Sequence, residues 1–389
     1  MGQGCRSLSM NHGTIFYMHS ARQRLLAASD GTAHQLVSHH FGDQAYGRKI
    51  YIQAGLHADE IPGVLVAVTL QARLQQLEKE GRLRCEVVLV STANPIGLAQ
   101  VVLGYPIGRF DLASGRNFNR GFPLLAGKIA EAVEGELGGD AKKNIATIRR
   151  VWRDLLLAQQ PRQTFDDLQR ALMLLSLDAD IILDLHCSRE AALHLYTGEA
   201  LWQQAEPLAR YLGASASLLA VDSGGQSFDE AHSFTWWQLQ QRFNERFPIA
   251  HGSTAITVEH RGQRDVNDEL ARKDAAAILD YLTWYGAIEA QVKPLPPLAY
   301  PATPLAGSEQ FYAPVTGILL HCVEPGARVS AGQQMFVIVD TTDGTRTAIC
   351  SRTAGIFYMR RDVRYVRQGD PLGRVSGEEV IRSGYLLSA

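Results

Sequence analysis

Two short apolar segments separated by an amphipathic one restrict the fold of this chain more than any other feature. Residues 48–55 (RKIYIQAG) show the pattern of a short buried strand that ends in glycine. In residues 64–81, apolar side chains recur three or four positions apart until a glycine, which is typical of a helix packed on a strand. Residues 85–95 (CEVVLVSTANP) are a second apolar run, rich in β-branched residues. Strand, helix and strand in this order predict a parallel crossover, and therefore a parallel sheet.

The same alternation of helices and strands continues to about residue 290. Residues 123–177 are largely helical, with apolar positions three and four apart. We expect further strands at 179–188, 217–223 and 254–260, and helices at 234–243 and 268–290. Residues 14–47 show no clear pattern. The predicted fold class is α/β, with a mixed, largely parallel sheet flanked by helices.

A proline-rich segment marks a boundary in the last quarter of the chain. Residues 292–307 (VKPLPPLAYPATPLAG) hold five of the fifteen prolines, which excludes a helix interior or a central strand. Residues 308–376 then alternate short β-rich runs with glycine turns, and the two halves of this segment have similar sequence patterns. We therefore predict an α/β domain in residues 1–291, a linker, and a small all-β, barrel-like domain in residues 308–389. This domain resembles the biotinyl and lipoyl carrier fold, but no lysine follows Lys293, so a carrier role is not expected.

Composition and charge exclude several classes of function. The 38 Lys and Arg residues nearly balance 40 Asp and Glu, so the net charge is −2 and no basic stripe indicates a nucleic-acid partner. Apolar stretches are shorter than the roughly 20 residues that span a bilayer, and the N-terminus lacks the apolar core of a secretory signal. Five scattered cysteines form no CxxC pair, which predicts neither a disulfide framework nor a cysteine zinc site. We expect a cytoplasmic globular protein with no nucleic-acid or membrane partner.

Residues that can bind a metal ion follow two of the predicted strands. His57 and Glu60 come directly after residues 48–55, and His186 comes after the apolar run 181–185. Taken alone, His57 could cap a strand, and Glu60 could favour the positive end of a helix. However, binding sites in open α/β sheets assemble at the carboxyl ends of the strands. Two histidines and a carboxylate there meet the needs of catalytic zinc, which takes three N or O ligands and leaves one position for water.

A water molecule activated by zinc also needs a base. Glu259 ends the strand predicted at 254–260 and could take a proton from that water. The alternative for Glu259 is a carboxylate at a strand end that faces solvent. Its neighbour His260 would point to the opposite face of the strand, so we do not expect it to be a metal ligand.

An arginine-rich loop, residues 108–123 (GRFDLASGRNFNRGFP), is expected at the same edge of the sheet because it follows the second strand. A cation can polarise a substrate carbonyl, and arginine holds a carboxylate through two parallel hydrogen bonds. Such loops are more often solvated surface, so both interpretations stay open at this point. The candidates in the loop are Arg109, Arg116 and Arg120, with Asn117 and Asn119 between them.

Five motifs in this order resemble those of the succinylglutamate desuccinylase and aspartoacylase family, a branch of the zinc carboxypeptidase superfamily. They are GLHADEIPG (55–63), NPIG (94–97), RNFNRGFP (116–123), DLHCS (184–188) and ITVEH (256–260). The resemblance covers residues 48–375, and it implies a zinc carboxypeptidase-like catalytic domain in residues 1–291 and a C-terminal barrel. Three positions depart from the family pattern: Ala58 replaces a glycine, Asn117 an aspartate, and Cys187 a serine or threonine.

The resemblance implies one zinc ion per chain, bound by His57, Glu60 and His186. Glu259 would be the general base and later the proton donor to the leaving amine. Zinc would lower the pKa of the bound water towards about 7 and act as a Lewis acid on the carbonyl.

The loop residues would act on the substrate. Arg109 would polarise the scissile carbonyl, although Arg116 is close enough in sequence to compete for this role. Asn119 and Arg120 would hold a substrate carboxylate.

The reaction we expect is the zinc-dependent hydrolysis of a linear amide, which removes a small acyl group from an N-acyl amino acid. The alternatives are a metallocarboxypeptidase or cell-wall peptide amidase on the same scaffold, and a non-catalytic binding protein. A serine nucleophile is not indicated, because no G-x-S-x-G elbow occurs. The expected partner is the small-molecule substrate, and a homo-oligomer stays open.

Overall fold

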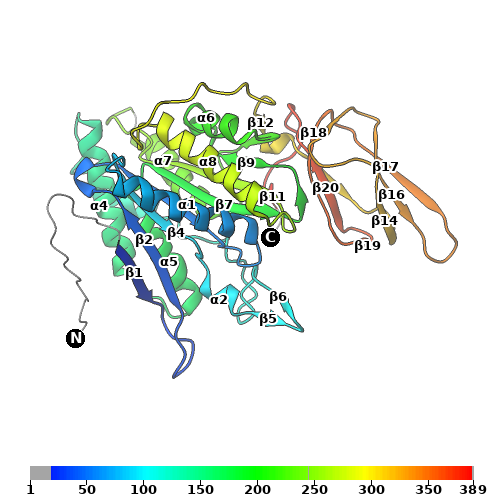
Figure 1. Ribbon diagram of the computed structural model, residues 1–389, viewed down its shortest axis with the longest axis horizontal. Helices are drawn as coiled ribbons and strands as arrows, with labels where there is room; N and C mark the ends of the chain where they lie inside the picture. The colour runs from blue at the N-terminus through cyan, green and yellow to red at the C-terminus, as the bar shows by residue number, and fades with distance from the viewer. Residues whose placement is uncertain (1–18, 244, 388–389) are drawn as a thin grey trace.

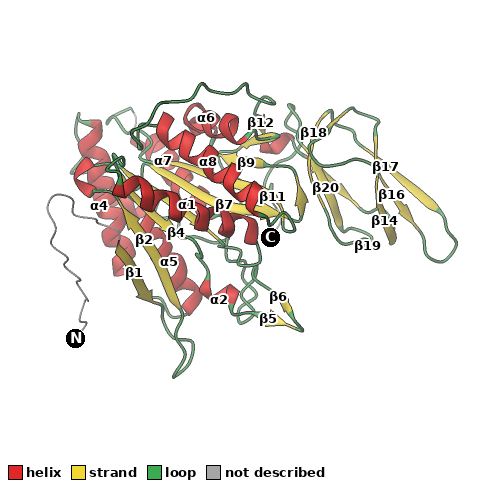
Figure 2. Cartoon of the chain, viewed as in Figure 1, coloured by secondary structure: helices red, strands yellow, loops and turns green. Residues whose placement is uncertain are grey.

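The structure, a computed structural model, describes residues 19–243 and 245–387. Its main part is a nine-stranded sheet with helices on both faces, and a smaller group of strands lies at one end (Figure 1, Figure 2). The strand order across the large sheet is β1-β2-β4-β3-β7-β11-β9-β10-β12. This arrangement confirms the predicted α/β class with a mixed, largely parallel sheet and additional C-terminal strands.

Four parallel strands form the centre of the large sheet. They are β4 (Glu86–Val90), β3 (Lys49–Ala54), β7 (Ile181–Ser188) and β11 (Thr254–Gly262), paired in this order. Nearly all of their residues are buried because both faces of the sheet are covered, which explains the continuous apolar runs in the sequence. All four strands end at the same edge, so side chains at their carboxyl ends can meet there.

The outer strands of the large sheet are shorter or more exposed. β1 (His19–Arg24) and β2 (Gln35–Phe41) form an antiparallel pair, and β2 also pairs with β4 in the antiparallel direction. On the other side, β9 (His194–Thr197) runs antiparallel to β11, and β10 (Ala216–Leu219) and β12 (Thr303–Pro304) follow. The sequence did not predict β1, β2 or β9. β1 is largely exposed and β2 is polar at alternate positions, so neither forms an apolar run. Residues 14–18 of the segment without a pattern lie outside the described residues.

Helices enclose the sheet in two apolar cores. One face packs on α1 (Ile61–Lys79), α6 (Trp202–Leu212) and α8 (Asp268–Trp284). The other face packs on α3 (Ala126–Val133), α4 (Ala141–Ala158), α5 (Thr164–Ser176) and α7 (Phe228–Phe243). Helix α7 therefore begins six residues before the predicted 234–243, and α8 ends before residue 290. The remaining short helices are α2 (Pro95–Leu98) and the 3-10 turns η1 (Gln44–Tyr46), η2 (Glu199–Leu201) and η3 (Leu305–Gly307).

The C-terminal strands form two small sheets around a core of their own. One contains β13 (Glu309–Tyr312), β20 (Pro371–Val375), β18 (Gly355–Arg360) and β15 (Arg328–Val329). The other contains β17 (Arg346–Cys350), β16 (Gln334–Val339), β14 (Gly317–His321) and β19 (Tyr365–Val366). We call this group the barrel, although its strands form two separate sheets. Strand β8 (Glu190–Ala191), which directly follows β7, pairs with β18 and joins the barrel to the carboxyl edge of the large sheet.

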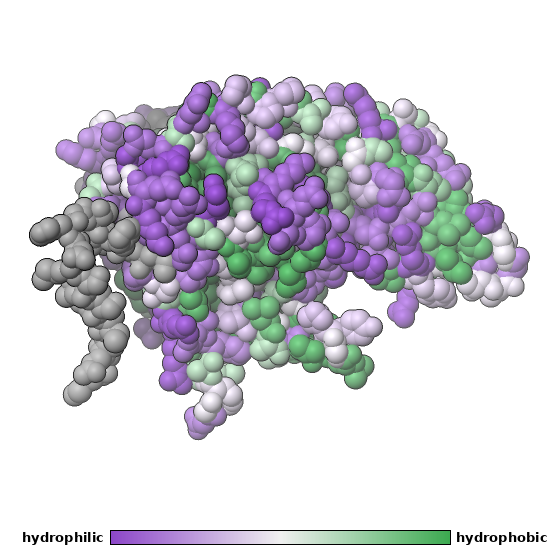
Figure 3. All heavy atoms as spheres, in the orientation of Figure 1, coloured by the Kyte–Doolittle hydropathy of each residue, from purple (hydrophilic) through white to green (hydrophobic). Residues whose placement is uncertain are grey.

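A hairpin of β5 (Val101–Val102) and β6 (Tyr105–Pro106) projects from the large domain. Its apolar side chains are exposed, and Figure 3 shows hydrophobic residues gathered there. Among the described residues, no helix is long and apolar enough to cross a membrane.

Candidate functional site

A sharp turn after β3 brings the first two predicted ligands to the sheet edge. Gly55 has a φ of +69°, and a Cβ there would lie 2.9 Å from Val64 Cγ2, so glycine is required. The turn leads through His57 to Glu60, which occupies the N-cap position of α1. The Glu60 carboxylate makes no capping hydrogen bond to the helix and contacts His57 and His186 instead. This geometry decides against a purely helix-capping role for Glu60.

His186 and Glu259 lie on neighbouring strands at the same height. β7 pairs with β11 in parallel, and His186 lies directly opposite Glu259 in the register. β7 also pairs with β3, whose end leads into the turn that carries His57. The carboxyl edge of three adjacent strands therefore brings together residues that are up to 202 positions apart in the sequence, as from His57 to Glu259.

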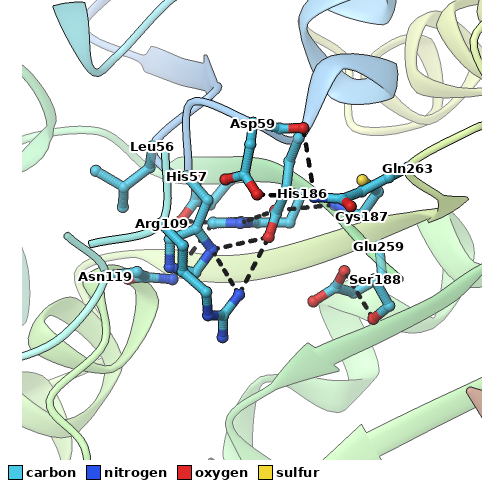
Figure 4. A network of polar contacts seen from close by, with 12 residues as sticks. Leu56, His57, Asp59, Arg109, Asn119, His186, Cys187, Ser188, Glu259 and Gln263 are labelled. Atoms are coloured by element: carbon cyan, nitrogen blue, oxygen red, sulfur yellow. Dashed lines mark hydrogen bonds and ion pairs between the residues drawn. The ribbon is translucent and has the colours of Figure 1, made fainter. Parts of the chain in front are cut away.

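The donor atoms of His57, Glu60 and His186 lie within 4.8 Å of one another, and all three residues are buried. His57 Nδ1 is 2.9 Å from Glu60 Oε1, and His186 Nδ1 is 2.8 Å from Glu60 Oε2. The two imidazole rings meet edge to face, with their centroids 5.0 Å apart. Figure 4 shows His57, His186 and Arg109 gathered at this point. We call these three donor residues the His-Glu-His cluster.

Hydrogen bonds on the far side of each ring determine which nitrogen atom can bind a cation. His57 Nε2 is 2.8 Å from Asn117 Oδ1, and that oxygen also accepts a hydrogen bond from a backbone N–H. His186 Nε2 is 2.9 Å from Asp184 Oδ2. Since both oxygens accept only, each Nε2 carries the proton. When each ring is neutral, its Nδ1 lone pair faces the Glu60 carboxylate, and a cation between these acceptors would satisfy all of them.

The donor set of the His-Glu-His cluster fits a zinc ion. Two imidazole nitrogens and one carboxylate are a common catalytic set, which leaves one coordination position for water or substrate. Metal-binding histidines usually donate their second N–H to an oxygen, as both histidines do here. The cluster is therefore the candidate metal centre.

In the protein without metal, burial and the charges within the cluster shift the pKa values of His57, Glu60 and His186. Burial, followed by the nearby Arg109, lowers the pKa of His57 to about 4. Burial opposes protonation of His186 too, but Asp184 and Glu60 raise its pKa well above the ordinary value. Burial would raise the pKa of Glu60, yet the two histidines lower it well below its usual range. A proton on His186 thus supplies the positive charge that the site requires, and a metal ion would replace it.

A buried polar network supports His186 from inside the sheet. Gln53 Nε2 donates to Asp184 Oδ1 at 2.9 Å, and Tyr51 Oη donates to Gln53 Oε1 at 2.8 Å. This support was not predicted from the sequence. Asp184 stands two positions before His186, which places both on the same face of β7, and this spacing could have indicated the contact.

Glu259 faces the cluster from β11 without joining it (Figure 4). Its Oε2 accepts a hydrogen bond of 3.3 Å from Ser188 Oγ. Burial, and next the charge of Glu60, raise the pKa of Glu259 to about 7, which suits a general base at neutral pH. His260 lies on the other side of the strand, where its Nδ1 is 2.8 Å from Asp274, as the alternation along the strand predicted.

Arg109 and Arg116 were both candidates to polarise the scissile carbonyl, and of the two Arg109 lies at the cluster. Its Nη1 is 3.2 Å from both His57 Nδ1 and Glu60 Oε1, and its side chain is partly open to the cavity. Arg116 pairs with Asp166 at 2.5 Å, and its guanidinium lies over a phenylalanine ring. Arg109 therefore lines the cavity beside the cluster, whereas Arg116 links the loop to α5.

Asn119 and Arg120 also line the cavity. Asn119 Oδ1 accepts a hydrogen bond of 2.8 Å from the Phe228 backbone N–H, so its amide nitrogen faces inward, 3.3 Å from His186 Nε2. Arg120 Nη1 donates to the Asn119 carbonyl at 2.7 Å. Burial, followed by the charge of Arg109, lowers the pKa of Arg120.

One cavity of about 500 Å³ is lined by the His-Glu-His cluster and by four further candidate residues, Glu259, Arg109, Asn119 and Arg120. The strand edge forms one wall, and the first turn of α7 adds Asp229 and Glu230. The barrel forms much of the remaining wall. This contribution was not predicted, since no sequence pattern indicates which face of the barrel meets the sheet. The barrel residues include Gln310, Met359, Arg360, Arg361, Leu372 and Arg374.

Comparisons with known proteins agree with this geometry. Residues 46–144 match the family model of the succinylglutamate desuccinylase/aspartoacylase catalytic domain. This segment contains two of the three cluster residues and the arginine-rich loop. The resemblance predicted from the motifs is confirmed. No curated protein matches the sequence significantly.

Solved structures are similar over nearly the whole chain. A protein of the succinylglutamate desuccinylase/aspartoacylase family from Shewanella amazonensis SB2B is 26% identical, with a TM-score of 0.77 over 92% of this chain and 98% of its own. A succinylglutamate desuccinylase/aspartoacylase from Rhodobacter sphaeroides is 18% identical, with a TM-score of 0.64 over 93% and 95% of the two chains. The product-bound ectoine utilization protein EutE (DoeB) from Ruegeria pomeroyi is 14% identical, with a TM-score of 0.65 over 92% and 95%. The likeness to the last two concerns the fold alone.

Proposed function

Because residues 46–144 match the family model of the succinylglutamate desuccinylase/aspartoacylase catalytic domain, we propose that this protein is a zinc-dependent amidohydrolase. It removes a small acyl group from an N-acyl amino acid and releases the acid and the free amine. The observation that carries the proposal is the convergence of His57 Nδ1, His186 Nδ1 and the Glu60 carboxylate, with Glu259 opposite on the next strand.

His57, Glu60 and His186 hold the zinc ion in this proposal. Zinc bound there supplies a Lewis acid and lowers the pKa of a coordinated water to about 7. Asn117 and Asp184 keep both histidines in the tautomer that presents Nδ1.

Glu259 moves the proton. Its carboxylate accepts a proton from the attacking water at Oε1 or Oε2 and then gives this proton to the leaving amine nitrogen. In the protein without metal, burial and then the charge of Glu60 raise the pKa of Glu259 to about 7, and a group that must first accept and later donate a proton works best with a pKa near the ambient pH. Ser188 keeps the carboxylate oriented through its hydrogen bond.

The arginine-rich loop binds the substrate. Arg109 donates a hydrogen bond to the carbonyl oxygen as negative charge develops there. Asn119 and Arg120 hold the carboxylate of the amino acid, the guanidinium through its two parallel donors.

The cavity favours a small substrate over the alternatives on the same scaffold. A metallocarboxypeptidase or a cell-wall peptide amidase must admit a polypeptide, whereas barrel residues close one side of this cavity of about 500 Å³. A non-catalytic binding protein would not need Glu259 buried beside an intact cluster. A cytoplasmic location and domain boundaries at residues 291 and 308 are further parts of the proposal.

Amine release from a panel of N-acetyl, N-succinyl and N-formyl amino acids tests the function. The zinc-loaded protein should release amine from members of the panel, and the Glu259→Gln variant should release it at least about 100-fold more slowly. Hydrolysis of C-terminal residues from peptides without turnover of N-acyl amino acids would favour the carboxypeptidase alternative.

A further inference from the structure

Strand β11 departs from a regular strand directly after the candidate general base. Its register with β7 places Glu259 opposite His186, and the next pair joins Gly262 to Ser188. Three steps along β11 therefore correspond to two along β7, so the strand contains a β-bulge with one extra residue. Within this bulge, Arg261 has a φ of +67°, a left-handed conformation that is rare for a side chain of this size.

The bulge changes the face of the sheet to which Arg261 belongs. Ile256 and Val258 pack in the core on the side of α1, α6 and α8, whereas Thr257 and Glu259 line the cavity. Because side chains alternate along a strand, a regular strand would place Arg261 on the cavity face, two positions after Glu259. The structure places its guanidinium on the opposite face, against α8.

Asp274 of α8 holds Arg261 on that face. Arg261 Nη1 donates to Asp274 Oδ2 at 2.7 Å, and Nη2 donates to Oδ1 at 3.0 Å, so both carboxylate oxygens are bound. His260 Nδ1 lies 2.8 Å from the same Oδ2. Burial would raise the pKa of Asp274, but the hydrogen bonds from His260 and Arg261 lower it to about 2. The carboxylate is therefore charged at neutral pH, and two consecutive residues of the bulge are fixed to one buried side chain.

The guanidinium of Arg261 needs a carboxylate partner, because it stays protonated and its side chain is only 17% exposed. Two other carboxylates lie within four positions of Arg261 in the sequence. Asp265 Oδ2 already accepts a hydrogen bond from the Gly262 backbone N–H at 2.8 Å. The other is Glu259, whose carboxylate a neighbouring guanidinium would hold in the charged form and occupy at the oxygens that accept the proton.

We propose that Asp274 is a positioning residue for the general base. It keeps the guanidinium of Arg261 on the α8 face and thereby prevents an ion pair between Arg261 and Glu259. This inference rests on the role of Glu259 in the proposed function. Asp274 acts through Arg261 and contacts neither the His-Glu-His cluster nor the substrate.

A pair of variants tests this role by second-site rescue in the full-length, zinc-loaded protein. Asp274→Asn keeps the size of the side chain and an oxygen for His260, but it loses the charge that holds Arg261. We expect kcat to fall by about tenfold or more, with a full equivalent of zinc and a KM within about twofold of the wild-type value. The double variant Asp274→Asn/Arg261→Gly should recover kcat to within about threefold of the wild type, since glycine also accepts the positive φ.

A double variant as slow as Asp274→Asn would overturn the inference, because removal of the arginine does not repair a loss that is merely structural. The matched control is Asp280→Asn on the same helix, where Asp280 pairs with Lys293 at 2.8 Å. This control should keep the wild-type kcat, and a loss equal to that of Asp274→Asn would also overturn the inference.

Crystal structures of the wild type and Asp274→Asn give a readout that does not depend on turnover. We expect the guanidinium of Arg261 at Asp274 in the wild type and beside Glu259 in the variant. A guanidinium that stays in place, or that pairs with Asp265, would overturn the inference. If the wild type hydrolyses no N-acyl amino acid, the proposed function fails, and the position of Arg261 in the variant still decides whether Asp274 holds it away from Glu259.

Thermal unfolding shows whether Asp274→Asn is folded. If it is not, Arg261→Gly alone decides the question. The inference predicts a kcat close to that of the wild type, because the arginine affects the base only when it is released into the cavity. A loss of about tenfold or more in Arg261→Gly would show that the arginine itself supports Glu259, and the inference would be overturned.

Discussion

His186 Nε2 lies 2.9 Å from Asp184 Oδ2, two positions earlier on the same face of β7. Gln53 holds the other oxygen of Asp184, and Tyr51 in turn holds Gln53. This buried chain fixes the imidazole so that its Nδ1 faces Glu60. The candidate metal centre is thus supported from inside the sheet as well as by Asn117 of the arginine-rich loop.

Replacing Asp184 tests this support. In Asp184→Asn, one of the two carboxylate oxygens becomes an amide nitrogen. If this nitrogen faces His186 Nε2, the bond to the histidine is lost, and if the amide turns over, the hydrogen bond from Gln53 is lost instead. Either result disfavours the tautomer that presents Nδ1, so we expect zinc affinity to fall by about 10- to 100-fold. The control is Asp178→Asn, which removes a carboxylate near the other end of β7, where it pairs with Lys49. Zinc titration against a competing chelator measures both variants, and unchanged affinity in Asp184→Asn would refute a supporting role.

Zinc binding should release a proton from His186. Asp184 and Glu60 raise the pKa of His186 against the effect of burial, so this ring stays protonated to higher pH than an ordinary histidine. The metal must displace that proton, and therefore affinity should rise with pH. Calorimetry at pH 7 in two buffers of different ionisation enthalpy should show a release of about one proton per zinc. Heats that do not depend on the buffer would contradict the assignment of the proton.

Glu259→Gln should separate metal binding from turnover. Glutamine keeps the size and much of the hydrogen bonding of the side chain but cannot accept a proton. We expect zinc occupancy to stay intact while kcat falls by about 100-fold or more. A variant with near-normal turnover would remove Glu259 from the mechanism.

The pH profile gives a second readout of the same role. Burial, then the charge of Glu60, raise the pKa of Glu259 to about 7, so the fraction in the carboxylate form decreases as the pH falls through that value. The base must be deprotonated, and kcat/KM should therefore fall on the acid side. A bound cation stabilises the carboxylate of Glu259 and therefore shifts this decrease in kcat/KM to lower pH. The residual activity of Glu259→Gln should show no decrease in kcat/KM on the acid side of the pH profile. A decrease that persists in this variant would be due to the titration of another group.

Arg120→Lys tests recognition of the amino-acid carboxylate. Lysine keeps the charge but loses the two parallel donors, so substrates with a free carboxylate should lose about 1.5 to 3 kcal/mol in kcat/KM, and their amidated analogues should lose little. Arg116→Lys is the matched control in the same loop, because Arg116 pairs with Asp166. Equal losses on free acids and amides would show that Arg120 supports the loop instead.

The sequence predicted those parts of the fold that depend on local patterns. The four central strands are buried on both faces, so each one is a continuous apolar run that a sequence can reveal. β9 has only four residues and runs antiparallel, and nothing in its local pattern indicates its partner β11. The exposed strand β1 gave no signal for a related reason, since its alternation is weak.

The site was predictable to the same extent. His57, Glu60, His186 and Glu259 each follow an apolar run, so their shared position at strand ends could be inferred from the sequence. The barrel residues of the cavity wall could not be found in this way, because the face of the barrel that meets the sheet depends on packing in three dimensions. Asp184 is an intermediate case. Its spacing of two positions from His186 can be read from the sequence, but its hydrogen bond with His186 cannot.

The zinc content of two histidine variants tests the central claim most directly. Purified wild-type protein, His186→Gln and His260→Gln are dialysed against the same zinc buffer and analysed for metal per chain. His260 is the control because it is a buried histidine one strand away, with Asp274 as its partner. We expect one tightly held zinc per chain in the wild type and in His260→Gln, and a loss of most of it in His186→Gln. A full equivalent of tightly held zinc in His186→Gln would contradict the metal centre described here.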